Sequence, residues 1–197
     1  GKFGDLIVLN NVLAHVPEIN DFVAALKVVL KEEGTITVEF PHLLQLINNN
    51  LFDTIYHEHY FYFSLICLKK IFKSHGLSIY NVDQLDTHGG SLRIYATHEG
   101  NNLDTTSDKN SVIKITKLET NQGVNKLSFY SQLSINAYSI KLNALNYLIN
   151  KKILKKSIVA FGAAAKGNTF LNYCGIKKDM IDFVVDETPY KIGKYLP

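Results

Sequence analysis

The sequence of 197 residues has little of what several common functions require. Its only cysteines, Cys67 and Cys174, are far apart and too few for a disulfide framework or a four-cysteine zinc site. Such sparse cysteine suits a reducing cytoplasm, where we expect the protein to act. Arg93 is the one arginine, so the bidentate contacts typical of DNA readers are mostly excluded. Because the net charge is only +3, we expect no nucleic-acid partner.

Long apolar runs are also missing from the sequence. None approaches the roughly 20 residues that a membrane-spanning helix needs, so we expect no membrane partner. The first ten residues lack the basic and apolar segments of a signal peptide. A strand-like run begins almost at the first residue and the sequence stops soon after another, which predicts a fragment of a longer protein.

The first third of the sequence predicts a βαβ unit. A strand is predicted over 5–9, because the apolar run after Asp5 is typical of a strand buried on both faces. A helix should follow, capped by Asn20 and Asp21 and ended by Gly34. The next strand is predicted over 35–40. Strand, helix and strand with short joints favour a parallel sheet.

A second helix and two further strands are predicted in the middle of the sequence. Ser64 should cap the helix, and Gly76 should end it. The strands are expected over 77–82 and 91–97. Residues 100–110 have the composition of a loop.

The last part of the sequence predicts a long helix and a second βαβ unit. The helix should run from about residue 124 to 156. A strand over 157–162, a turn and helix over 163–175, and a strand over 180–186 should follow. The predicted architecture is therefore α/β, with two lobes joined by a helical segment.

The stretch YHEH at 56–59 concentrates polar side chains that could do chemistry. His57 and His59 would share one side of a strand, as zinc ligands could, but no further close ligands are evident. The stretch could also be a loop whose imidazoles make ordinary hydrogen bonds. A third interpretation is acid–base chemistry, because histidine titrates near neutrality. Glu58 could then fix the tautomer of His59, while Tyr56 holds a substrate oxygen.

Asn10, Asn11 and His15 form a second candidate site. They stand just past the carboxyl end of the first predicted strand. Ligands of open α/β sheets bind outside the carboxyl ends of strands, so a cofactor or substrate is expected here. His15 could instead be a hydrogen-bonded histidine at the entry to a helix.

Two turns that contain glycine are further candidates. Gly89 and Gly90 follow His88 and precede a strand, and paired glycines either admit a ligand close to the backbone or simply form a turn. The stretch GAAAKGNT at 162–169 follows a strand and opens a helix, where Lys166 could help to bind an anion. It matches neither GxGxxG nor GxxxxGK[ST], so it could also be a tight turn with an exposed lysine.

Five stretches of the sequence, in this order, resemble the S-adenosylmethionine-dependent C-methyltransferases of nucleotide-linked deoxysugars. They are NVLAHVPEINDF, FDTIYHEHYFYFS, THGGSLRIY, GAAAKGNTFLNYCGI and VVDETPYKIGKYLP. The resemblance implies that residues 1–105 are the late half of a class I methyltransferase Rossmann-like sheet, which ends in an antiparallel strand. Residues 106–197 would be the C-methyltransferase C-terminal domain, with a long helical linker and a second Rossmann-like lobe.

The resemblance also implies a cofactor. It further implies that two features which bind this cofactor in the family are missing from this sequence. S-adenosyl-L-methionine would be the methyl donor, with Asn10 and Asn11 on its side of the site. The glycine-rich loop that cradles it and the acidic residue for its ribose are absent from the sequence. Zinc is expected only in an N-terminal domain that the sequence does not contain, so no metal site is predicted here.

The chemistry of the family assigns a role to each catalytic candidate. A base removes the acidified C3–H of a 4-keto sugar, and the carbanion attacks the methyl group of the sulfonium. His59 would be the base, with His15 as its partner near the keto oxygen or the sugar. Tyr56 and Glu58 would orient the sugar and tune the imidazole.

The substrate implied by the resemblance is a nucleotide-linked sugar. The turn formed by His88, Gly89 and Gly90 would approach it, together with Lys166. Two other functions stay open on the sequence alone. One is a catalytically inactive fragment that binds a nucleotide or a partner. The other is a nicotinamide-dependent oxidoreductase built on the second βαβ unit, against which the missing GxGxxG after Phe161 speaks.

Overall fold

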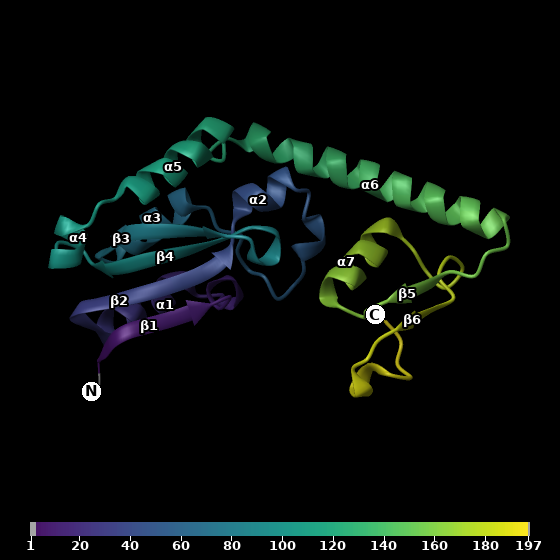
Figure 1. The fold of residues 1–197 in the computed structure, drawn as a ribbon, viewed down its shortest axis with the longest axis horizontal. Helices are drawn as coiled ribbons and strands as arrows, with labels where there is room; N and C mark the ends of the chain where they lie inside the picture. Colours follow the sequence, from purple (N-terminus) through teal and green to yellow (C-terminus); the bar gives the residue numbers. More distant parts are fainter. Residues whose placement is uncertain (1–2, 197) are drawn as a thin grey trace. The chain divides into compact units, whose positions relative to one another are not determined.

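The computed structural model describes residues 3–196 of the chain, as a mixed α/β structure with two compact units (Figure 1). The first unit comprises Gly1–Asn49 and Glu58–Ser131, and the second comprises Asn50–His57 and Gln132–Pro197. The predicted domain boundary between residues 105 and 106 stays a prediction. None of the helices within residues 3–196 is long and apolar enough to cross a membrane.

A mixed four-stranded sheet organises the first unit. Its strands are β1 (Gly4–Asn10), β2 (Leu30–Pro41), β3 (Leu77–Leu85) and β4 (Ser91–His98), in the spatial order β1-β2-β4-β3. Strands β1 and β2 are parallel and are connected through α1 (Ile19–Val29), which confirms the first predicted βαβ unit. Strand β4 runs antiparallel to both of its neighbours, so an antiparallel strand does end the first hundred residues.

Helix α1 differs from its prediction at both ends. Its N-cap residue is Glu18, whose side chain makes no capping bond, so the predicted cap at Asn20 and Asp21 is wrong. The helix ends at Val29 because the backbone becomes extended at Leu30, where β2 begins. Gly34 therefore lies inside β2 and does not end the helix.

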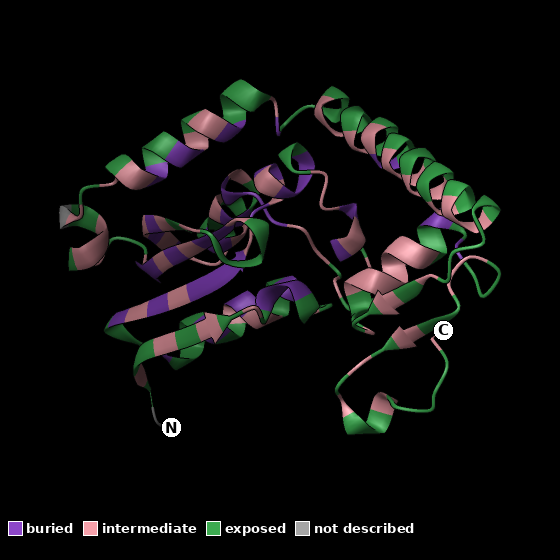
Figure 2. Cartoon of the chain, turned by 45° about the vertical axis from the view of Figure 1, so that its right-hand side comes forward, coloured by how far each residue is buried: buried purple, intermediate pink, exposed green. Residues whose placement is uncertain are grey.

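Strand β1 is buried on one face only, which corrects the prediction that both faces are buried. Leu6 and Val8 are 58% and 56% exposed, whereas Ile7 and Leu9 pack against the core. Exposed and partly buried residues alternate along the strand (Figure 2). The reason is that β1 lies at the edge of the sheet, and the core of the first unit lies on the side of Ile7 and Leu9.

Three helices of the first unit pack side by side. Helix α1 contacts β2 and α3 (Leu65–Ser74), and α3 contacts β3 and α5 (Asn110–Gln122). The main hydrophobic cluster lies between these helices and the strands. Its fully buried members include Ile36, Phe40, Leu65, Leu68, Phe72, Leu77, Leu92 and Ile94. A short helix, α2 (Leu43–Asn48), follows β2 directly.

Ser64 caps α3 as predicted, and this cap can be tested. Its side-chain oxygen accepts a hydrogen bond from the backbone N–H of Cys67 at 3.2 Å. Replacing Ser64 by alanine should lower the free energy of unfolding by about 0.5–2 kcal/mol, because that N–H loses its partner. Urea unfolding followed by circular dichroism measures this change. The matched control is Ser74→Ala in the last turn of α3, and an equal loss in both variants would contradict the capping role.

The region between residues 100 and 156 holds more helices than predicted. Helix α4 (Asn102–Thr106) lies where a loop was expected, and the side chain of Asn101 caps it by accepting from the N–H of Asp104 at 3.0 Å. The predicted long helix is α6 (Leu127–Ile153), and α5 precedes it as a separate helix that ends at Gly123. Helix α4 was not predicted because its polar residues are typical of caps and turns. Helix α5 was not predicted because the buried glutamate within it interrupts the apolar pattern of the helix.

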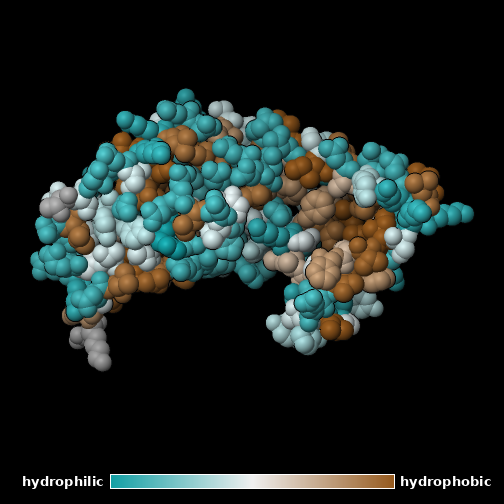
Figure 3. Space-filling view, in the orientation of Figure 1, coloured by the Kyte–Doolittle hydropathy of each residue, from teal (hydrophilic) through white to brown (hydrophobic). Residues whose placement is uncertain are grey.

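The second unit contains the second predicted βαβ unit. Strands β5 (Val159–Phe161) and β6 (Phe183–Val185) are parallel, with α7 (Ala165–Cys174) between them in sequence. The ring of Phe52, from the short 3-10 helix Phe52–Thr54, lies 5.0 Å from that of Tyr173 on α7. Hydrophobic side chains gather on the surface of this unit (Figure 3). Among them are the exposed Phe161 and Phe183 of its two strands.

Candidate functional site

The carboxyl end of β1 brings two predicted site residues together. Asn10 is the last residue of β1, and Asn11 follows it with a φ of 55°. The backbone N–H of Asn11 donates to the carbonyl of Glu39 on β2 at 2.9 Å. The side-chain Nδ2 of Asn11 lies 3.4 Å from Nε2 of His88, although these residues are 77 positions apart in sequence. Asn11 and the glycine turn thus meet at the carboxyl end of β1.

His15 and His59 form a second cluster, here called the histidine pair. Their ring centroids lie 4.8 Å apart with the planes tilted by 54°. His15 ends the 3-10 turn Leu13–His15, and the N–H of Tyr60 donates to the carbonyl of Ala14 at 2.9 Å. This backbone bond holds the chain after His59 against the turn that carries His15.

The tautomer of His15 follows from its hydrogen bond. Nδ1 lies 2.9 Å from the backbone carbonyl oxygen of Glu58. A carbonyl oxygen only accepts, so Nδ1 must carry the hydrogen and donate it. In the neutral ring, Nε2 is then the nitrogen with the lone pair, which leaves it able to accept a proton from a ligand.

The structure gives less information about the other predicted site residues. Glu58 contacts His15 through its backbone carbonyl, while the residue itself is exposed. Tyr56, His57 and Lys166 belong to the second unit, and His57 is exposed. The roles of Tyr56, Glu58 and Lys166 stay predictions. Within residues 3–196, no group of three or more histidine, cysteine, aspartate or glutamate side chains could hold a metal ion.

Sequence reasoning missed an ion pair beside Asn11, in which a buried glutamate meets a partly exposed arginine. Glu39 is only 6% exposed, and it accepts hydrogen bonds from Nη2 of Arg93 at 2.6 Å and from the hydroxyl of Thr87 at 3.2 Å. The bond to Glu39 raises the pKa of Arg93 above its usual value. The one arginine therefore ties β4 to β2. The available signal was a charged residue between the apolar positions of the strand TITVEF.

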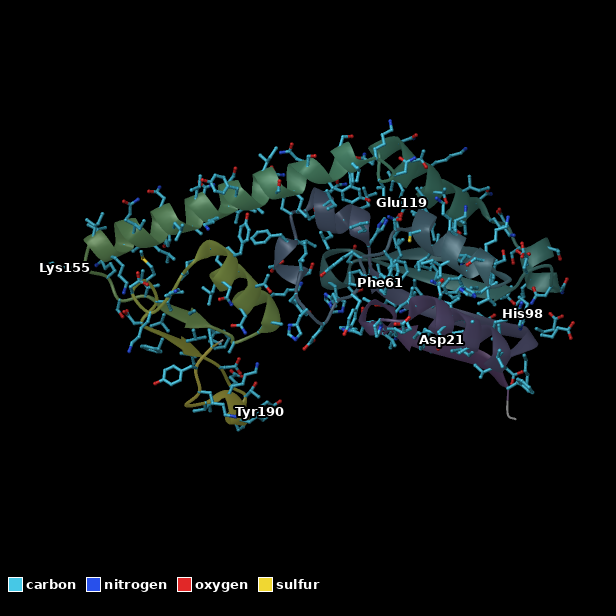
Figure 4. All side chains as sticks on the ribbon, turned by 180° about the vertical axis from the view of Figure 1, so that it is seen from behind. Asp21, Phe61, His98, Glu119, Lys155 and Tyr190 are labelled. Atoms are coloured by element: carbon cyan, nitrogen blue, oxygen red, sulfur yellow. The ribbon has the colours of Figure 1, made fainter. Side chains whose placement is uncertain are left out.

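A second buried pair, His42 with Glu119, was also missed. The two side chains are 1% and 0% exposed, and Nε2 of His42 donates to Glu119 at 2.8 Å. Glu119 also accepts from the backbone N–H groups of Leu65 and Ile66 at 2.6 and 2.8 Å. Those groups begin α3, where the helix dipole favours a negative charge. Figure 4 labels Glu119 on α5. No local pattern signals a contact that spans 77 positions.

The last predicted site residue, Lys166, is the second residue of α7, directly after the turn that leads into this helix. Gly162 has a φ of 91°, and Ala164 is the N-cap residue without a side-chain capping bond. The carboxylate of Asp186 accepts from the N–H of Ala163 at 2.6 Å. Nζ of Lys191 donates to the carbonyl of Ala163 at 2.9 Å. The segment after β6 therefore holds this turn in place.

Asp186 should make the stability of the second unit depend on pH. Hydrogen bonds from the hydroxyl and N–H of Thr188 and from the N–H of Ala163 hold its pKa below the usual 3.8. A lowered pKa stabilises the folded state above that usual value, and the contribution is lost as the pH falls below it. We expect Asp186→Asn to lower Tm at pH 7 and to flatten the loss of stability below pH 3.8. Thermal unfolding from neutral to acid pH, with the exposed Asp179→Asn as control, measures both changes. Parallel acid curves for wild type and Asp186→Asn would refute this role.

Comparison with known proteins identifies the family. A family model described as the C-methyltransferase C-terminal domain matches residues 86–197. This match covers more than half of the chain, so the protein belongs to the C-methyltransferase family.

Individual relatives cover the chain to different extents. The C-methyltransferase NovU of Streptomyces niveus is 32% identical over 184 residues, which are 93% of this chain and 43% of NovU. The chain thus spans less than half the length of that relative. Magnesium protoporphyrin IX methyltransferase (ChlM) from Synechocystis PCC 6803, solved with bound SAH, is 17% identical with a TM-score of 0.39, over 50% of this chain and 47% of ChlM. An O-methyltransferase family protein from Burkholderia thailandensis is 15% identical with a TM-score of 0.37, over 51% and 32% of the two chains. Both scores are too low to establish a shared fold.

Proposed function

We propose that the protein acts in the S-adenosylmethionine-dependent C-methylation of a nucleotide-linked 4-keto-deoxysugar, in the cytoplasm. Membership of the C-methyltransferase family supports the reaction type. The observation that carries the proposal is the histidine pair, in which His15 and His59 lie in ring contact. Two imidazoles at one place can remove a proton from carbon and support the charge that develops.

The proposed reaction begins at the sugar. A 4-keto group acidifies the neighbouring C3–H, because the resulting negative charge is shared with the ketone oxygen. His59 is the proposed base, which takes the proton on a ring nitrogen. Such a base accelerates a reaction by about 10²–10⁴-fold. His15 is proposed to act beside it, and this is supported by the ring contact with His59 and by the bond from Nδ1–H to the carbonyl of Glu58, which leaves the Nε2 lone pair of the neutral ring out of that bond.

Asn11 provides one test of whether the residues present suit the methyl donor. Its side-chain Oδ1 is buried and has no hydrogen-bond partner among the described residues. It stands just after the carboxyl end of a parallel strand, the usual position of ligands in such sheets. An unpaired acceptor there fits a hydroxyl or ammonium donor of S-adenosylmethionine, which supplies the methyl group. Asn10 and Asn11 would hold only part of that molecule.

The strand order is consistent with the finer fold assignment. We infer that residues 1–105 form the late half of a class I methyltransferase sheet and residues 106–197 the C-terminal domain with its long helix. Support comes from the parallel strands β1 and β2 and from β4, which lies antiparallel between β2 and β3. The family match begins at residue 86, ahead of the inferred boundary.

Methyl transfer tests the proposal directly. Purified full-length protein should transfer label from methyl-labelled S-adenosylmethionine to a nucleotide-linked 4-keto-deoxysugar, with loss of the hydrogen at C3. Product analysis by mass spectrometry and NMR identifies the methylated carbon. Binding of the nucleotide sugar without any transfer of label would overturn the proposal in favour of a binding module. Label on oxygen or nitrogen would overturn the carbanion step.

A further inference from the structure

Glu39 holds two segments of the candidate site at the carboxyl end of β1. Its backbone carbonyl accepts from the N–H of Asn11 at 2.9 Å, and its carboxylate accepts from the hydroxyl of Thr87 at 3.2 Å and from Arg93 at 2.6 Å. Asn11 directly follows β1, whereas Thr87 begins the 3-10 turn Thr87–Gly89 that precedes β4. One residue of β2 therefore fixes two segments that are far apart in the sequence.

The two segments that Glu39 fixes also meet through their side chains. Nδ2 of Asn11 lies 3.4 Å from Nε2 of His88, the residue after Thr87. An amide N–H only donates, so Nε2 is the acceptor and Nδ1 carries the hydrogen of the neutral ring. Asn11 and His88 both have a φ of 55°, a left-handed conformation that is uncommon outside glycine and that persists only where surrounding contacts maintain it. The bond between them therefore depends on how the two backbones are held.

The burial of Glu39 favours a role besides stability. The residue is only 6% exposed, and Arg93 is the partner of its charge. Well-packed apolar residues of similar volume often stabilise a fold at least as well as a buried ion pair does. An apolar side chain, however, cannot accept the hydrogen bond that fixes Thr87. The carboxylate is therefore better explained by the groups that it positions.

Other bonds keep the turn folded without the hydroxyl of Thr87. The carbonyl of Gly90 accepts from the N–H of His42 at 3.0 Å, and the hydroxyl of Ser91 donates to the carbonyl of Thr87 at 2.9 Å. The bond from the Thr87 hydroxyl to Glu39 instead ties the start of the turn to β2. Removing that hydroxyl should thus release the side chain of His88 from its position and leave the fold intact.

We propose that Glu39 is a positioning residue that couples the two ligands of the reaction through the bond between Asn11 and His88. The inference rests on the proposed function, and on the assignment of Asn11 to S-adenosylmethionine and of His88 to the nucleotide-linked sugar. A ligand that orders one of the bonded side chains also orders the other, so the second ligand has less conformational freedom to remove when it binds. Each ligand should then raise the affinity for the other by the same factor, about fivefold or more.

The tautomer of His88 tests the positioning without any ligand. NMR spectra of the ¹⁵N-labelled chain of 197 residues should show the hydrogen on Nδ1, because the bond to Asn11 occupies the lone pair of Nε2. In Thr87→Val, which keeps the size of the side chain but loses the hydroxyl, we expect His88 to lose this fixed tautomer and Tm to stay close to wild type. The matched control is Thr35→Val, which removes a hydroxyl contact with Tyr80 earlier on the strand of Glu39. It should leave the resonances of His88 unchanged.

Calorimetry of the full-length protein tests the coupling. S-adenosylhomocysteine, which has no methyl group to transfer, is titrated with and without the nucleotide-linked 4-keto-deoxysugar. In wild type and in Thr35→Val, the sugar should tighten the binding of S-adenosylhomocysteine about fivefold or more. This gain should disappear in Thr87→Val and be retained in Thr87→Ser, which keeps the hydroxyl. Glu39→Gln should also reduce the gain, and if that variant does not fold, the two variants of Thr87 decide.

The outcomes distinguish this inference from the proposed function. An unchanged tautomer of His88 in Thr87→Val, or no effect of the sugar on the affinity of wild type for S-adenosylhomocysteine, would overturn the inference even if the full-length protein transfers methyl groups. Equal loss of coupling in Thr35→Val would also overturn it, because the loss would then not depend on Glu39. Coupling that requires the hydroxyl of Thr87, in a protein that transfers no methyl group, would support the inference and overturn the proposed function.

Discussion

Replacing His59 by glutamine should lower the rate of methyl transfer by the full-length protein about 10²- to 10⁴-fold, the range that a general base contributes. Glutamine is close in size to histidine but cannot take up a proton near neutral pH. The variant should therefore bind the nucleotide sugar and fail at the chemical step, with kcat reduced more than KM rises. Steady-state kinetics with the labelled methyl donor measures both parameters. His57→Gln is the matched control, since this exposed histidine lies two positions away.

Exchange of the C3 hydrogen with solvent shows which histidine of the pair is the base. In D₂O without methyl donor, wild-type protein should replace the C3 hydrogen of the 4-keto sugar by deuterium, and His59→Gln should not. The tautomer of His15 makes this comparison informative, because its Nε2 is itself able to accept a proton. Loss of exchange in His15→Gln together with normal exchange in His59→Gln would move the base to His15. Normal exchange in both variants would exclude the histidine pair as the base.

Removing the carboxylate of Glu119 should have the largest effect on folding. In Glu119→Ala, the Nε2–H of His42 and the N–H groups of Leu65 and Ile66 are left buried without an acceptor. Each buried donor that is left without a partner costs about 1–3 kcal/mol, so the three together should cost about 3 kcal/mol or more. That is a large share of the roughly 5–15 kcal/mol by which a domain is stable. We expect the first unit to unfold at much lower urea concentration, or to fail to fold at the temperature of expression.

Two further variants serve as comparisons for this prediction. The exposed Glu18→Ala should change the free energy of unfolding by less than about 0.5 kcal/mol, because its side chain makes no capping bond. Glu119→Gln keeps one acceptor oxygen and should fall between wild type and Glu119→Ala. A similar loss in Glu18→Ala and Glu119→Ala, measured by urea unfolding, would show that the buried pair does not stabilise the fold.

Much of the fold is encoded in local patterns. Apolar runs of the right length predicted β1, β2, β5 and β6, and the serine at position 64 predicted the start of α3. Where the prediction failed, individual residues had a structural preference that differed from the one indicated by the apolar period. Val28 and Val29 carry the apolar period of α1 into Leu30, but β-branched residues also suit a strand, and the chain becomes extended there. Helix α5 was missed because Glu119 occupies a position of its buried face.

The burial of β1 illustrates a limit of another kind. An apolar run is compatible with burial on both faces, yet Leu6 and Val8 are exposed. Which face is covered depends on where the helices pack and on the place of the strand in the sheet. Neither property is contained in the run itself.

The sequence by itself determined which residue types are available for chemistry and roughly which elements carry them. It placed Asn10, Asn11 and His15 after a strand and His59 in a polar stretch, because these relations are local. Only the tertiary structure decided which of them meet. The bond from His15 to Glu58 spans 43 positions, and those from Asn11 to His88 and from His42 to Glu119 each span 77. Such contacts depend on strand order and helix packing, which arise from the burial of the whole core and not from any local stretch of residues.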